Sequence, residues 1–99
     1  MLSAENILLF LKENRNNFKE QFHCVEIGLF GSFARNEQTS ESDIDFLVEF
    51  DKDTPNLYET EIRLKSFLKK QFGREIDICS KKWINPIFKP LVLQEARYA

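Results

Sequence analysis

Hydrophobic residues in the first quarter of the chain recur at helical spacing. A stripe at steps of four and seven is formed by Ile7, Leu11, Phe18 and Phe22, which predicts one helix over roughly residues 4–21 with this stripe facing the core. Ser3 stands directly before the segment and is a residue type that caps helix N-termini.

Three later segments alternate apolar and polar residues, which is typical of half-buried strands. We expect these strands over residues 23–30, 43–50 and 75–79. Between the first two, the sequence predicts a sharp turn at Gly31, a single helical turn over 32–36 and a polar loop over 37–42.

A second helix is predicted from Pro55 to Phe72, with Gly73 as its C-terminal stop. Its inward positions are Leu57, Leu64, Leu68 and Phe72. After the third strand, two prolines exclude one regular helix, so we expect a loop through Asn85 and a short helix starting near Pro90. An apolar cluster in this region is assigned to the core in preference to an interface: Trp83, Ile84, Ile87 and Phe88.

Charge and length narrow the class of protein. The chain has 99 residues, with 14 Lys and Arg against 16 Asp and Glu and a net charge of −2. A dedicated nucleic-acid binder is normally clearly basic, so we expect no direct nucleic-acid binding. No apolar run approaches the roughly 18 residues of a membrane span, and no signal-peptide pattern opens the chain; we therefore expect no membrane partner and a cytoplasmic location. A chain of this size has room for one core, which predicts a single domain over residues 1–99.

The cysteines and the histidine exclude several chemistries. Cys24 and Cys79 are the only cysteines, too few for a disulfide framework and not spaced as a zinc knuckle, and both are predicted to be small buried hydrophobes. His23 is the only histidine, which excludes any mechanism that needs a pair of histidines.

Candidate chemistry concentrates between Gly31 and Asp45, where Gly31 and Ser32 are followed by ten residues and then by Asp43-Ile44-Asp45. Residues two apart on a strand share a face, so the two aspartates project together. Paired carboxylates suit one or two hard divalent cations, most naturally Mg²⁺ bridging substrate phosphates. Alternatively, the two aspartates simply begin a strand in solvent and bind nothing. In that case the presence of the neighbouring motif residues would be a coincidence.

Five residues besides Asp43 and Asp45 contribute to this candidate site. Gly31 permits close backbone approach, and Ser32 would open a helical turn whose NH groups face an anion. Arg35 would contact the phosphates or pair with a carboxylate, two roles that the sequence leaves open. Ser42 would cap or orient the aspartate loop. Asp77 would complete a carboxylate triad, as metal ligand or proton acceptor, if the third strand neighbours the second.

The sequence resembles the minimal nucleotidyltransferases of the polymerase-beta superfamily. The resemblance rests on Gly31, Ser32, Asp43, Asp45 and Asp77, together with the runs GSFAR and SDIDFLV. It implies an α/β (α+β) fold with a small mixed sheet of three or more strands flanked by helices. It also implies Mg²⁺ on the aspartates and ATP as the substrate, with transfer of a nucleoside monophosphate to a hydroxyl.

The same resemblance implies a partner. A stand-alone member and its partner look like a toxin–antitoxin pair. The partner is a HEPN-domain ribonuclease toxin, and the family member is the antitoxin, which adds AMP to a tyrosine of the toxin. Two rival hypotheses remain from the sequence: a binding module that masks its partner and only senses nucleotide, and a metal-dependent nuclease or phosphatase. The second is disfavoured because no histidine constellation supports hydrolysis.

A loose basic group in the second half has two interpretations, a solvated helix face or a contact for triphosphate or an acidic partner. Its members are Lys65, Lys69, Lys70, Arg74, Lys81 and Lys82.

Overall fold

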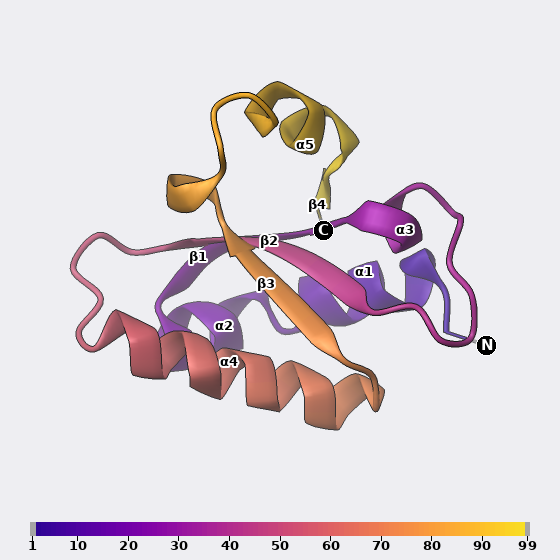
Figure 1. Ribbon diagram of the computed structural model, residues 1–99. Helices are drawn as coiled ribbons and strands as arrows, with labels where there is room; N and C mark the ends of the chain where they lie inside the picture. The colour runs from indigo at the N-terminus through magenta and orange to yellow at the C-terminus, as the bar shows by residue number, and fades with distance from the viewer. Residues whose placement is uncertain (1, 99) are drawn as a thin grey trace.

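A computed structural model describes residues 2–98, in which helices and strands alternate along the chain (Figure 1). The elements are α1 (Ala4–Glu13), α2 (Arg15–Phe22), β1 (Cys24–Phe30), α3 (Gly31–Ala34), β2 (Ile44–Phe50), α4 (Leu57–Phe72), β3 (Ile76–Ser80), the 3-10 helix η1 (Lys81–Trp83), α5 (Lys89–Glu95) and β4 (Arg97–Tyr98). No helix among the described residues has the length and apolar character that crossing a bilayer requires.

The strands form one sheet in the order β3-β2-β1-β4. β1 pairs antiparallel with both β2 and β4, whereas β2 pairs parallel with β3. The expected mixed sheet is confirmed, and its fourth strand, β4, is one that the sequence did not predict. Because β2 and β1 occupy the centre, β3 and β4 are the two edges.

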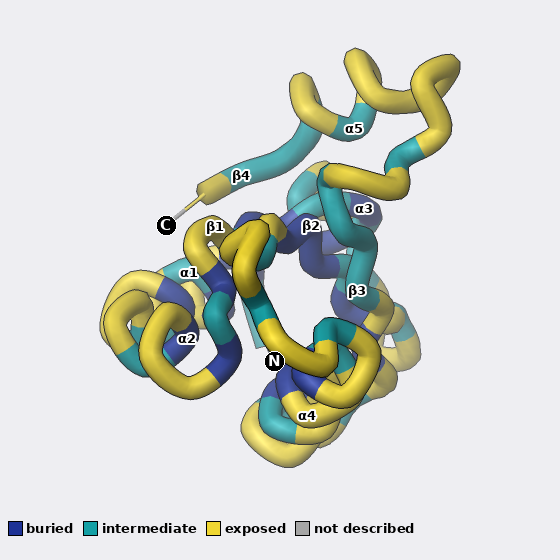
Figure 2. Tube along the Cα trace, turned by 90° about the vertical axis from the view of Figure 1, so that its left-hand side faces the viewer, coloured by how far each residue is buried: buried dark blue, intermediate teal, exposed yellow. Residues whose placement is uncertain are grey.

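The core lies between one face of this sheet and the helices α1, α2 and α4 (Figures 1 and 2). On β2, Ile44, Phe46 and Val48 are fully buried against this side. Phenylalanines from different helices meet there, with ring centroids 5.2 Å apart for Phe10 and Phe72. Full burial of a phenylalanine side chain contributes about 1.5–3 kcal/mol, and partly buried rings such as these contribute less. The alternate residues of β2 face the other side, on which α5 lies.

Two of the predicted helix ends are confirmed. Ser3 Oγ accepts a hydrogen bond from Asn6 N at 3.1 Å, and Asn6 Oδ1 accepts one from Ser3 N at 3.2 Å, which is a reciprocal capping arrangement. Gly73 ends α4 with φ +66°, in the left-handed region that favours glycine.

The prediction of one N-terminal helix is wrong, because the segment divides into α1 and α2 at Asn14. The Asn14 side chain donates to the carbonyl of Phe10 at 2.9 Å and thus competes for an acceptor that the helix would otherwise use alone. The apolar stripe keeps its direction through the break, since Ile7, Leu11 and Phe18 all remain buried.

The prediction of a C-terminal core cluster is also wrong. Trp83 is 72% exposed, Ile87 is 80% exposed and Phe88 is 56% exposed. A helix does begin near Pro90, as expected, but α5 contains no buried residue. Of the two cysteines predicted to be buried, Cys24 is buried and Cys79 is only partly so.

Candidate active site

Asp45 and Asp77 lie side by side on the two parallel strands. They are register partners across β2 and β3, which fulfils the condition that the third strand neighbours the second. Neither side chain points to the core, because the core-facing residues of β2 alternate with Asp45 along the strand. Asp43 stands just before the first residue of β2 and is exposed. The structure thus brings together a carboxylate pair with a third carboxylate two residues away.

Gly31 packs its backbone directly against this pair. It has φ +73°, and a Cβ built there would lie 2.1 Å from Asp45 Oδ2. Any other residue would be strained by the backbone angle and would also displace the carboxylate. Glycine at this position therefore allows the turn after β1 to pack directly on Asp45.

Burial and the neighbouring carboxylates raise the pKa of Asp45 from 3.8 to about 6. The largest cause is burial, followed by the charge of Asp77 and a hydrogen bond with it, and then by the charge of Asp43; Arg35 acts in the opposite direction. Two carboxylates so close resist carrying charge together. A cation between them would relieve that repulsion.

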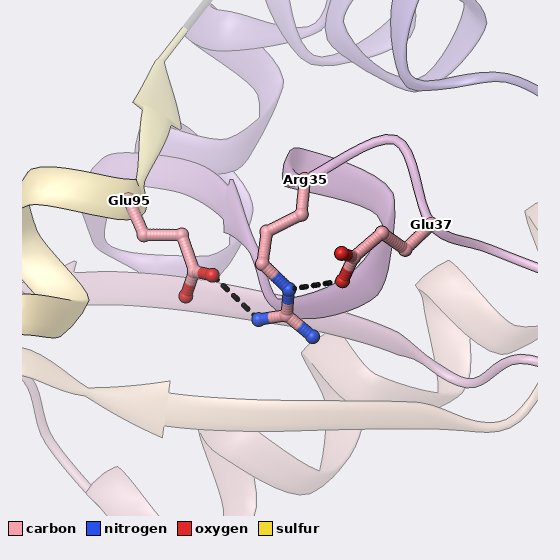
Figure 3. A network of polar contacts seen from close by, with 3 residues as sticks. All are labelled: Arg35, Glu37 and Glu95. Atoms are coloured by element: carbon pink, nitrogen blue, oxygen red, sulfur yellow. Dashed lines mark hydrogen bonds and ion pairs between the residues drawn. The ribbon is translucent and has the colours of Figure 1, made fainter.

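Ser32 lies in the short helix α3, which begins at Gly31, and Arg35 directly follows its last residue. Ser32 is the second residue of α3, where the amide groups of a first turn have no acceptor within the helix. Arg35 is held by two glutamates (Figure 3): its Nε lies 2.8 Å from Glu37 Oε1 and its Nη1 lies 2.5 Å from Glu95 Oε1. Arg35 thus forms ion pairs, with glutamates as partners, and its contact with phosphates stays a prediction.

The loop before Asp43 is fixed by Ser42 and by Arg74. Ser42 Oγ accepts from the amide of Thr39 at 2.8 Å and closes the turn. The Arg74 guanidinium donates to the carbonyl of Ser42 at 2.9 Å and to that of Thr39 at 3.1 Å. Sequence reasoning placed Arg74 in a basic group; its position next to the helix stop gave no sign that it would reach the loop. Arg74 holds the aspartate loop in place.

The donor chemistry of the three aspartates fits a hard divalent cation, because carboxylate oxygens are the ligands such ions prefer. As the side chains stand, residues 2–98 contain no set of three or more Asp, Glu, His or Cys side chains arranged to hold a metal ion. Asp45 and Asp77 supply two adjoining carboxylates, and Asp43, two residues before Asp45, adds a third that is exposed. The residues present fit such a cation.

Comparison with known proteins links this arrangement to one family. A family model described as a nucleotidyltransferase domain matches residues 11–98. A Methanocaldococcus jannaschii protein named as a candidate protein adenylyltransferase is 35% identical over 99 residues, covering 99% of each chain. The protein adenylyltransferase MntA of Thermococcus cleftensis is 34% identical over 98 residues, covering 99% of this chain and 97% of its own.

Two solved structures share the fold. One, of a candidate minimal nucleotidyltransferase, has a TM-score of 0.80 at 30% identity and covers 99% of this chain and 97% of its own. The other is a toxin–antitoxin crystal structure with AMP-PNP, which has a TM-score of 0.66 at 21% identity and covers 97% of this chain and 71% of its own.

Proposed function

The chain belongs to the family of nucleotidyltransferase domains, and from this membership we propose that it moves AMP from ATP to a hydroxyl group of a partner protein. The observation that carries the proposal is the pairing of Asp45 with Asp77 directly beneath the Gly31 turn. Nucleotidyl transfer needs groups that stabilise the charge around phosphorus and groups that bind phosphate. A carboxylate pair next to a glycine turn combines the two.

Phosphate binding is assigned to the turn after β1. Gly31 presents bare backbone, and the Ser32 hydroxyl with the first-turn amides of α3 would donate hydrogen bonds to phosphate oxygens. Arg35 directly follows this helix and retains one guanidinium nitrogen outside its two ion pairs for a phosphate contact. Ser42 keeps the aspartate loop closed around the site.

Asp43, Asp45 and Asp77 would hold one or two Mg²⁺ ions, which supply charge neutralisation at the phosphates. In the chemical step, the acceptor oxygen attacks the α-phosphorus of ATP and the bond from this phosphorus to the bridging oxygen breaks. Pyrophosphate leaves, and Asp77 takes the acceptor proton. Positioning and preorganised charge supply most of the rate in reactions of this kind.

The acceptor is proposed to be a tyrosine of a HEPN-domain toxin, for which this chain would act as the antitoxin. Support comes from the relatives named as protein adenylyltransferases and from the toxin–antitoxin structure of the same fold that contains AMP-PNP. Masking of the partner without chemistry is the competing function, and the exposed apolar residues of α5 give it a specific observation.

Label transfer separates the two functions. The purified protein is incubated with Mg²⁺, ATP labelled on its α-phosphate and a lysate of the source cell. The wild type and the control variant Asp53→Asn, an exposed turn position, should label one protein band, whereas Asp43→Asn and Asp45→Asn should not. A band that persists with either site variant would overturn the assignment of the carboxylates. If no protein is labelled while the site variants neutralise the partner fully, masking is the function.

A further inference from the structure

Residues 81–95, which we call the bridge segment, carry an unusual density of exposed apolar side chains. They run from the end of β3 to the start of β4, and thus from one edge of the sheet to the other. Exposure is 72% for Trp83, 80% for Ile87, 56% for Phe88 and 64% for Leu91. Figure 2 shows this stretch as largely exposed, standing away from the buried core. An apolar patch of this kind, outside the core, marks an interaction surface.

The bridge segment also has a charge of its own. Residues 81–94 contain Lys81, Lys82, Lys89 and no acidic residue, while the whole chain has a net charge of −2. Lys81 is paired with Glu26, but Lys89 has no ion-pair partner among residues 2–98. At the base of the segment, a cavity of about 440 Å³ is lined by Lys52 and these three lysines and by the acidic residues Glu49 and Asp51, so lysines outnumber carboxylates four to two. An acidic partner would complement this surface.

A second copy of this chain is a poor occupant. In a two-fold contact the same patch faces itself, so the lysines of one copy would oppose those of the other. Acidic residues on the partner would instead meet Lys82 and Lys89, and its apolar groove would cover Ile87 and Leu91.

The bridge segment lies on the same side of the sheet as the candidate site. Glu95, its last residue, contacts Arg35, which directly follows α3. The end of the segment therefore lies next to the turn that packs on Asp45, and a protein seated on the segment would approach this side of the site.

From these observations we propose that the bridge segment is the docking surface for the acceptor protein, which contributes an apolar groove rimmed by carboxylates. The proposal rests on the proposed function, because it identifies the docked protein with the one that receives AMP. Affinity comes from the apolar side chains, and the lysines select an acidic partner and speed its approach.

The test combines capture with label transfer. The bait proteins are the wild type, Asp45→Asn and the double variant Ile87→Ser/Leu91→Ser; Tyr58→Ser/Ile62→Ser, which removes two exposed apolar residues from α4, is the matched control. Proteins captured from a source-cell lysate are identified, purified and titrated against each bait. Unchanged unfolding midpoints and an unchanged Kd for ATP show that the docking-surface and control variants are folded.

We expect one acidic protein, labelled by the wild type with α-labelled ATP, to bind the wild type, Asp45→Asn and the control equally. Its Kd should rise at least tenfold with the double variant. Lys82→Glu/Lys89→Glu should weaken binding at least tenfold, whereas Lys65→Glu/Lys70→Glu on α4 should leave it within twofold.

The failures are distinguishable. A labelled protein that binds the double variant as well as the wild type overturns the docking surface and leaves the transferase function intact. A protein that docks on the segment without being labelled overturns both its role as acceptor and the transfer function. Self-association of the wild type that the double variant abolishes would make the segment a dimer contact and overturn the proposal. Absence of both a bound and a labelled protein would overturn the docking surface and the transferase function together.

Discussion

Replacement of Asp45 by asparagine is expected to stabilise the metal-free protein while abolishing transfer. Burial and the neighbouring carboxylates raise the pKa of Asp45 from 3.8 to about 6, so ionising this group costs the folded state free energy that the unfolded state does not lose. A shift of roughly two pK units corresponds to about 3 kcal/mol. Asp45 is only half-buried, and solvent screening reduces the effect to about 1–2 kcal/mol. The asparagine side chain is uncharged and would donate its amide to Asp77.

The effect has a defined pH dependence. Because the folded pKa lies above the unfolded one, the folded state holds its proton to higher pH, and the wild type loses stability as pH rises from about 4 to about 6. Below this window the wild type and Asp45→Asn should have nearly equal stability, because both side chains are then uncharged. Above it the variant should unfold at a midpoint higher by about 4–8 °C per kcal/mol.

Thermal unfolding in EDTA at pH 4 and pH 8 measures this difference, with Asp53→Asn as the control. Addition of Mg²⁺ at pH 8 should raise the midpoint of the wild type more than that of Asp45→Asn, since a ligand stabilises only the form that binds it. A variant no more stable than the wild type at pH 8, or a difference independent of pH, would refute the argument from carboxylate crowding.

Three other outcomes follow from the structure. Gly31→Ala should abolish transfer and cost clearly more stability than Gly73→Ala, because both have positive φ but only Gly31 has a carboxylate within 4 Å of the added Cβ; equal losses in urea unfolding would contradict this. Leu68→Ala should cost about 2–5 kcal/mol, since the side chain is fully buried, and a loss below about 1 kcal/mol would show that the core closes around it. A thiol reagent should modify Cys79 before Cys24, whose burial raises its pKa to about 12, and mass spectrometry of the native protein checks the order.

Local signals predicted most of the elements correctly. The alternation of apolar and polar residues located β1, β2 and β3 to within one or two residues. Ser3 caps α1 and Gly73 ends α4, as their residue types predicted. The break at Asn14 was missed because a side-chain amide that competes for a helix carbonyl leaves the apolar periodicity unchanged. β4 was missed because two residues carry no periodicity, and only β1 makes them a strand.

The candidate site was predictable in its residue types but not in its arrangement. The spacing from Gly31 to Asp45 indicated a turn next to a carboxylate, yet nothing local specified that β3 would lie parallel to β2 and bring in Asp77. One of the two ion pairs of Arg35 depends on Glu95, 60 positions away. The exposure of Trp83 could not be read from sequence either, because an apolar cluster has the same composition whether its own core or another protein covers it.

The bridge segment separates stability from recognition within one short chain. No residue of α5 is buried, and the core is built from other helices and the opposite face of the sheet, so substitutions in α5 carry little thermodynamic penalty. Both ends of the segment are nevertheless fixed by strands, which limits its conformational freedom before any partner arrives. Exchange of residues 81–95 between relatives should therefore redirect the same chemistry to a new protein acceptor, making this stretch the natural place for such proteins to diverge into separate, non-interfering pairs.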